Sequence, residues 1–311
     1  MSKQLPFYLR QTPRPKNDPA DGLPAFETEK QVAERYAARG RLMFTGNPMS
    51  QPNFYWCAEA NPCDSAACFA CMREFRRWLV DAGAALLEQS LGQLSVASLV
   101  HHTLSRRPGN LNSFHLGKAK RQLSRHIDRA GLGSLVAIGG FDFSYNQPAN
   151  GSTPHWQPHA YVIWQGIDQE ILKRALSPFY PATAEIPRPV RVRNVTNLMA
   201  ALSYTAKAVF YRRTSYKDAS GRANTRSLPL LPPAERELLT YLDQLHPVDR
   251  LFLKNVRRQG SILIPQVSGA SAPSSVIMIG PSTGKSPSRS LSPKKMRLGA
   301  RTTAQDPHRR V

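Results

Sequence analysis

The stretch TPHWQPHAYVIW at residues 153–164 limits the fold more than any other part of the chain. It reads as a β-strand, and the side chains of a strand point alternately to its two faces. Apolar side chains occupy one face, and they include Trp156, Ala160, Val162 and Trp164. The other face carries a polar row made of His155, Gln157, His159 and Tyr161. Such a row has little reason to face an apolar core, so we expect this strand to line a site.

The neighbouring segments predict an α+β domain over residues 93–260, with a mainly antiparallel central sheet flanked by helices. The spacing of apolar residues separates strands from helices. Strands are expected at 94–104, 135–146, 155–166 and 188–195, and helices at 114–131, 168–180, 197–213 and within 232–258. A turn-rich loop joins the second strand to the third, so these two are expected to pair antiparallel.

The charge of the chain favours a polyanionic partner. Lys and Arg number 42 against 21 acidic residues, which gives a net charge of +21. An excess of this size points to nucleic acid first and to an acidic membrane surface second. No apolar run approaches the roughly 18 residues that span a bilayer, and the N-terminus lacks the apolar core of a signal peptide. We therefore expect a soluble, cytoplasmic protein.

Both ends of the chain are expected to lack a fixed fold. Residues 1–40 are expected to form a flexible segment and residues 261–311 a disordered basic tail. The tail is rich in Ser, Pro, Gly and basic residues, which cannot bury enough apolar surface to offset the entropy of ordering. It is either a non-specific phosphate-binding arm or a solvated tail without a set partner.

All four cysteines fall within 15 residues, which predicts a metal site in the segment 41–92. They are Cys57, Cys63, Cys68 and Cys71, and they end in the Cys-x-x-Cys pair typical of tetrahedral zinc. Four thiolates would hold a structural Zn²⁺, with no open position for catalysis, ahead of a helix at 72–91. Unliganded thiols and a redox-active pair are the alternatives.

The polar row can supply ligands for a second metal ion. His155 and His159 share a face, and Asp142 in GGFDFSYN can add a carboxylate from the neighbouring strand. Imidazole and carboxylate donors suit Mg²⁺ or Mn²⁺, and Zn²⁺ less well. Taken singly, each histidine is more simply interpreted as a surface residue or a hydrogen-bonded core residue, and the metal site depends on their combination with Asp142.

The helix expected at 197–213 carries a candidate nucleophile. Tyr204 and Lys207 lie on the face opposite its apolar stripe. A tyrosine with a lysine one turn on can be an activated nucleophile, and the ammonium can hold a phosphate. An ordinary tyrosine of an amphipathic helix is the simpler alternative.

The order of these features resembles the HUH endonucleases, specifically the rolling-circle replication initiators of plasmids and phages. GGFDFSYN (139–146), PHAYV (158–162) and YTAK (204–207) follow the cysteine cluster and a basic helix within roughly residues 55–215. The resemblance implies that Tyr204 attacks single-stranded DNA at a replication origin, forms a 5′-phosphotyrosine and later rejoins the ends. It also implies that Lys207 assists at the phosphate, that Asp142 and His159 bind Mg²⁺ or Mn²⁺, and that host replication proteins of a bacterial cell are partners.

This chain departs from the family at one position. The second histidine of the family's His-x-His strand falls at Tyr161, a poor ligand for such a metal. Either His155 replaces it, or His155 and Gln157 form a His-hydrophobic-Gln variant beside His159. Otherwise the protein is a catalytically inactive, zinc-containing DNA-binding relative. A HUH-type tyrosine transposase would share the chemistry.

Basic side chains near these motifs are expected to contact the DNA backbone. They are Arg121 and Arg125 on the helix at 114–131, Arg191 and Arg193 on the strand at 188–195, and Arg73, Arg76 and Arg77 after the cysteines.

Overall fold

The computed structural model describes residues 29–43, 52–58, 61–88, 92–148, 153–217 and 223–266, together with residues 6, 8, 219 and 221. Residues 1–268 form one compact unit, and residues 269–311 are assigned to a second one. That second unit, and with it almost all of the expected basic tail, lies outside the described residues. Within the described ranges, none of the helices is both long and apolar enough to cross a bilayer.

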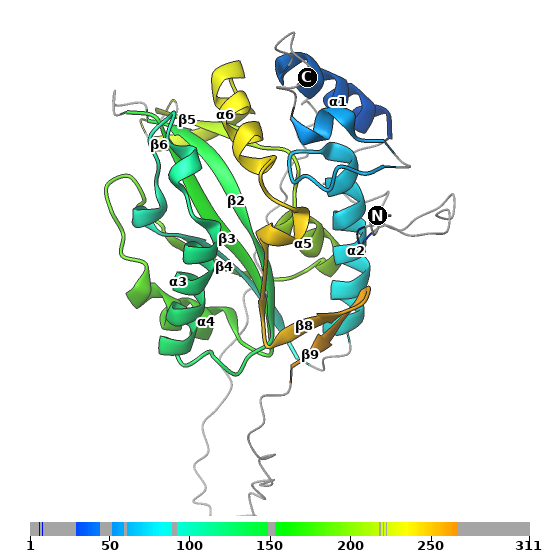
Figure 1. Ribbon diagram of the computed structural model, residues 1–311. Coiled ribbons are helices and arrows are strands. Elements are labelled where there is room, and N and C mark those ends of the chain that lie inside the picture. Colours follow the sequence, from blue (N-terminus) through cyan, green and yellow to red (C-terminus); the bar gives the residue numbers. More distant parts are fainter. Residues whose placement is uncertain are drawn as a thin grey trace, which may run out of the picture. The chain divides into compact units, whose positions relative to one another are not determined.

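A seven-stranded, mainly antiparallel sheet forms the centre of the unit, with helices on both faces (Figure 1). The strand order is β4-β1-β3-β2-β5-β6. Strand β7 pairs with the same edge of β2 as β5 does, but at the opposite end of that strand. The strands are β1 Leu94–Val100, β2 Ala137–Gln147, β3 His155–Gln165, β4 Val190–Asn194, β5 Tyr211–Lys217, β6 Ala223–Pro229 and β7 Leu251–Lys254. Only β2 and β5 pair in parallel among these described strands. The expected α+β class is confirmed.

The hairpin of β2 and β3 is the longest pairing in the sheet. Its register places Asp142 opposite His159 and Asn146 opposite His155. Directly paired residues of an antiparallel hairpin project to the same face. The polar row of β3 and the carboxylate of β2 therefore share one face, as the sequence predicts.

Different helices cover the two faces of the sheet. Helices α3 (Leu116–Arg129), α4 (Gln169–Leu176) and α6 (Pro232–Leu242) lie on the apolar face, where Phe143 packs against Phe114 and Tyr241. Helices α2 (Phe69–Leu87) and α5 (Leu198–Thr205) pack against each other on the face that carries Asp142. Helix α1 (Glu29–Met43) packs against α2. The cysteine segment and the sheet consequently share one core.

Several elements differ from the sequence-based expectation. The helix expected at 197–213 ends at Thr205, because the chain turns back and Tyr211–Lys217 pairs with β6 as strand β5. The last part of 232–258 is not helical, since Leu251–Lys254 pairs with β2 and Val256–Gln259 (β8) pairs with Ile262–Pro265 (β9). Helix α1 and strand β9 also extend into the ranges expected to be flexible.

One glycine allows α5 to approach the sheet. Gly140 lies on β2, two residues before Asp142, and faces the last turn of α5. A Cβ at this position would fall far inside van der Waals contact with the carbonyl oxygen of Thr205. The neighbouring atom belongs to the backbone, so it cannot rotate away. This close approach sets how near Tyr204 and Lys207 come to β2.

Gly140→Ala should therefore push α5 away from the sheet and destabilise the protein. Overpacking of this kind costs about 1–3 kcal/mol of unfolding free energy. Urea denaturation would measure the loss. The matched control is Gly117→Ala in α3, where the new methyl group would make ordinary contact with Arg121 at 3.6 Å. That change should be neutral or stabilise by about 0.5–1 kcal/mol, and equal losses in both variants would contradict the account.

Candidate active site and cysteine metal site

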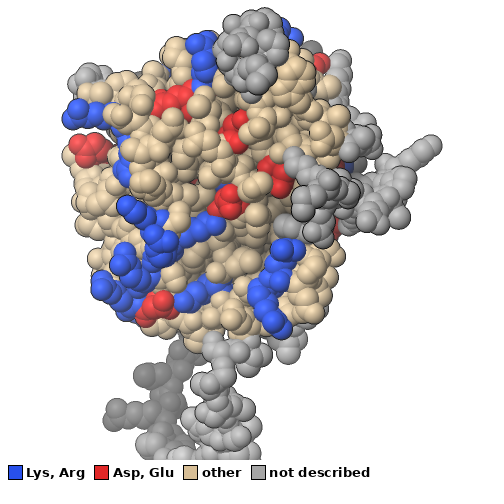
Figure 2. Space-filling view, in the orientation of Figure 1, with Lys and Arg blue, Asp and Glu red and all other residues tan. Residues whose placement is uncertain are grey.

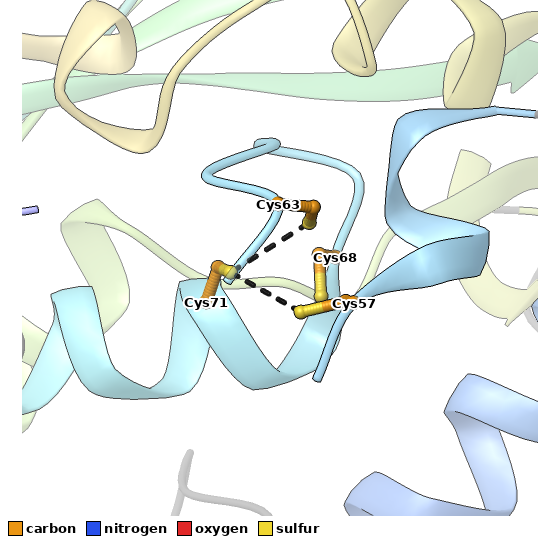
Figure 3. A group of neighbouring side chains, drawn as sticks. All are labelled: Cys57, Cys63, Cys68 and Cys71. Atoms are coloured by element: carbon orange, nitrogen blue, oxygen red, sulfur yellow. Dashed lines mark hydrogen bonds between the residues drawn. The ribbon is translucent and has the colours of Figure 1, made fainter. Parts of the chain in front are cut away.

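The four cysteines meet where a short 3-10 helix, a loop and the start of α2 come together (Figure 3). Cys57 follows η3 (Asn53–Trp56), Cys63 lies in the loop, Cys68 caps α2 and Cys71 lies in its first turn. Their sulfur atoms all lie within 4.8 Å of one another, and none forms a disulfide. The sulfur of Cys71 is 3.7 Å from those of Cys57 and Cys63.

These distances suit a tetrahedral metal site. A zinc ion with Zn–S bonds of about 2.3 Å separates its sulfur ligands by about 3.8 Å. The hydrogen bond with Cys63 is the largest influence that holds the pKa of the Cys57 thiol well below its usual range. The four cysteines can hold a metal ion such as zinc.

The loop between Cys63 and Cys68 is anchored to distant parts of the chain. Asp64, which has a positive φ of 55°, accepts a hydrogen bond from Tyr8 and pairs with His246 at 2.9 Å. The Ser65 hydroxyl donates to Asp243 at 2.6 Å, just after α6. The cysteine site is therefore built on the compact unit and does not stand apart from it.

The second group of functional side chains lies on the polar face of the β2–β3 hairpin. Nε2 of His159 is 3.2 Å from Oδ2 of Asp142, and Nδ1 of His159 is 3.2 Å from the Gln157 carbonyl oxygen. Nζ of Lys207 is 2.6 Å from the same Asp142 oxygen. Asp142 is 1% exposed and His159 5%, so water screens the charge of Asp142 only weakly.

The charges of this group stabilise one another. Burial alone would raise the pKa of Asp142, but Lys207 and then His159 outweigh it and hold this pKa well below its usual range. Burial likewise works to lower the pKa of Lys207, and Asp142 more than compensates, so the net shift is upward. Both residues are therefore ionised near neutral pH.

Tyr204 joins the group through Lys207. The ammonium of Lys207 lies 3.5 Å from the phenol oxygen of Tyr204 and 4.9 Å from the centre of its ring. The ring of Tyr204 also packs against that of Tyr161, with centroids 4.7 Å apart. Tyr161 in turn accepts a hydrogen bond of 3.2 Å from Arg193. Side chains from β2, β3, β4 and the end of α5 thus converge, and a phenol, an ammonium and a guanidinium lie close together.

Two residues expected at this centre lie elsewhere. His155 pairs with Asn146, at 3.3 Å between side-chain nitrogens, four residues along β3 from His159. The amide of Gln157 is engaged with Ser105 and with the His101 carbonyl group. Among the described residues, only the cysteines bring three or more His, Cys, Asp or Glu ligands together. His155 and Gln157 therefore do not complete a metal site with Asp142 and His159.

The basic residues expected to contact DNA fall into three places. Arg191 and Arg193 are exposed on β4, and their register with β1 and β3 places them on the face of Asp142. Arg121 and Arg125 are exposed on α3, on the opposite face of the sheet, where basic side chains gather at the lower left of Figure 2. The arginines after the cysteines are not surface contacts, because Arg73, Arg76 and Arg77 are buried.

One residue that supports this site gave no signal in the sequence. Arg250 is 1% exposed and donates from Nε to the Phe141 carbonyl (3.2 Å) and from Nη2 to the Lys207 carbonyl (3.1 Å). It thus ties the residue before Asp142 to the backbone of Lys207. Its partners are 109 and 43 residues away, so no local pattern could reveal this role.

No family model, curated protein or solved structure matches the chain. The functional assignment therefore rests on the geometry of this site.

Asp142→Asn should destabilise the fold, because it leaves the Lys207 ammonium buried without its counter-charge. Breaking a buried ion pair in this way costs about 3–5 kcal/mol. The folded pKa of Asp142 lies below the ordinary value, so its carboxylate stabilises the fold above about pH 4, and the contribution is lost as the pH falls further. Urea unfolding at pH 7 and pH 3 should show a larger gap between variant and wild type at pH 7.

Asp128→Asn is the matched control for that measurement. Asp128 pairs with Lys254 at 2.6 Å, but its side chain is 51% exposed. An exposed pair contributes about 0–1 kcal/mol. Equal losses in the two variants would show that the Asp142–Lys207 pair is not a buried, structure-bearing interaction.

The purified protein should contain one zinc ion per chain, and Cys71→Ser should lose it together with thermal stability, because three thiolates remain. Elemental analysis and thermal unfolding, with and without a chelator, would measure both effects. Four native thiols that react freely with a thiol reagent in metal-free, equally stable protein would rule the metal site out. A disulfide found in the native protein would favour the redox alternative.

Proposed function

We propose that this protein is a HUH-type endonuclease that nicks single-stranded DNA through Tyr204 and starts rolling-circle replication. One observation carries the proposal. The ammonium of Lys207 lies 2.6 Å from the carboxylate of Asp142 and 3.5 Å from the phenol of Tyr204, beside His159. Strand β2, strand β3 and the end of α5 therefore bring together a carboxylate, an imidazole, a phenol and an ammonium. These are the side chains that the three sequence motifs contribute. A tyrosine that only filled an amphipathic helix would not require this convergence.

The chemistry follows from the position of the phenol. The oxygen of Tyr204 attacks the phosphorus of a DNA phosphodiester, the bond to the 3′ oxygen breaks, and a 5′-phosphotyrosine forms. The proton lost by the phenol is balanced by the proton that the departing 3′ oxygen takes up. Lys207 is adjacent to the phenol, and its positive charge can offset the negative charge of the phosphate. The covalent bond keeps the energy of the phosphodiester, so the reverse reaction rejoins the ends without ATP.

Asp142 and His159 would hold a Mg²⁺ or Mn²⁺ ion. The donor atoms are suitable, because Oδ2 of Asp142 is buried and, apart from its charge contacts with Lys207 and His159, has no hydrogen-bond partner among the described residues. The ion would polarise a non-bridging phosphate oxygen when bound. In the structure, the ammonium of Lys207 provides the positive charge beside Oδ2 of Asp142. Lys207 and the ion would therefore have to share the Asp142 carboxylate.

The surroundings of the site are suited to a polyanion. Arg191 and Arg193 project from β4 on the same face as Asp142. Burial, followed by the nearby charges of Arg188 and Arg213, lowers the pKa of Arg191, so these cations are close enough to repel one another. A phosphate backbone would relieve that repulsion. The basic side chains of α3 lie on the opposite face of the sheet and would need a separate stretch of nucleic acid.

A second candidate is a DNA-binding protein that no longer cleaves. It is favoured by Tyr161, which occupies the place of the family's second metal-binding histidine and contacts Tyr204 rather than a ligand pair. Such a protein would retain the basic residues and the cysteine site. It would bind labelled single strands whether or not Mn²⁺ is present, and would not cut them.

Incubation with single-stranded DNA and Mn²⁺ should give a protein–DNA conjugate that survives denaturation. Tyr204→Phe should abolish the conjugate and leave DNA affinity nearly intact, because the ring and its packing remain. Tyr211→Phe is the matched control, since Tyr211 is 40% exposed on β5, and it should leave conjugate formation unchanged. A conjugate lost only in Tyr211→Phe would identify the other tyrosine as the nucleophile, and binding without any conjugate would support the second candidate.

A further inference from the structure

Three arginines from separate elements bind the backbone of residues 203–208, the segment that carries Tyr204 and Lys207. Arg76 on α2 is fully buried and lies 3.3 Å from both the carbonyl oxygen and the hydroxyl of Ser203. Arg250 donates to the carbonyl of Lys207 at 3.1 Å. Arg39 on α1 donates to the carbonyl of Ala208 at 2.8 Å. This segment spans the C-terminal end of α5, where carbonyl groups lack helical partners, and guanidinium groups satisfy them.

Arg39 also contacts the cysteine site. Its Nη1 donates to the carbonyl oxygen of Ala67, the residue before the metal-ligand candidate Cys68. Its guanidinium carbon lies 3.6 Å from the centre of the Phe69 ring, the first residue of α2. Arg39 is 5% exposed. The guanidinium group of Arg39 therefore links the cysteine loop to the backbone next to Lys207.

We propose that Arg39 is a positioning residue that couples metal binding at the four cysteines to the placement of Tyr204 and Lys207. A metal ion fixes Cys68 and thereby the carbonyl of Ala67 beside it. The rigid guanidinium transmits that position to Ala208, because its two donors are held at a fixed spacing. Loss of the metal releases Ala67, and the guanidinium of Arg39 then no longer holds residues 203–208 in one place. The catalytic consequence rests on the proposed function, whereas the coupling itself does not.

The coupling is measurable without any nuclease activity. Hydrogen exchange, followed by mass spectrometry on the full-length protein, reports how often the amides of 203–210 open. Arg39→Met keeps the bulk of the side chain but removes the hydrogen bonds to Ala67 and Ala208, so exchange in this segment should rise about tenfold or more. Removal of the metal from the wild type with a chelator should give a similar rise. Amides of β1 and β3 should keep their protection in both cases.

Two further variants define the specificity of the effect. Arg35→Met removes an arginine one turn earlier on α1 that faces the same Phe69 ring, at 5.6 Å, and should leave exchange at 203–210 unchanged. Arg39→Lys keeps the charge, but its single nitrogen cannot bridge both carbonyl groups, so it should show an intermediate rise. If Arg39→Met does not yield folded protein, the lysine variant carries the test.

The decisive comparison combines the two perturbations. If Arg39 transmits the effect, metal removal should add little to the exchange rate of Arg39→Met, whose zinc content should equal that of the wild type. Unchanged exchange in the Arg39 variants, or a full additional effect of chelation in them, would overturn the proposal. Absence of a DNA conjugate with the coupling intact would refute the proposed function alone.

Discussion

The buried charge of Asp142 is the interaction on which the rest of the site depends. A carboxylate that is 1% exposed in the middle of a sheet is costly to bury unless a cation accompanies it. On β3 its direct partner is His159, and a permanent positive charge reaches it only from outside the hairpin among the described contacts. Lys207 supplies that charge, and the chain must therefore leave α5 early and pass close to β2.

This requirement explains several features that are separate in the sequence. Gly140 removes the side chain that would keep α5 away, and Arg250 ties the backbone of Lys207 to that of Phe141. Arg39 on α1 and Arg76 on α2 bind the same segment. Some of the positive charge that the composition assigns to a nucleic-acid surface is thus inside the protein, where five arginines are buried among the described residues. Charge count alone therefore overstates the basic surface, although Arg191 and Arg193 are exposed next to the site.

The spacing of residues along the sequence correctly predicted the two central strands and the cysteine cluster. The alternation in 155–164 and in 135–146 placed the two central strands, and with them the shared face of Asp142 and His159. The cysteine spacing likewise predicted a compact cluster. Periodicity failed where tertiary pairing decides the conformation. The run from Tyr204 to Arg213 has acceptable helical spacing, but pairing with β6 and the ion pair of Lys207 favour a turn and a strand. His155 was misplaced for a related reason, because a shared face does not bring together residues four positions apart on a strand.

The ring of His159 is held at both of its nitrogen atoms. Nδ1 lies 3.2 Å from the Gln157 carbonyl oxygen, two residues back on the same strand, and Nε2 lies 3.2 Å from the Asp142 carboxylate on β2. A rotation of the ring would therefore break both contacts at once. The imidazole is consequently a fixed link between β3 and β2, and its orientation is set before any ligand approaches Asp142.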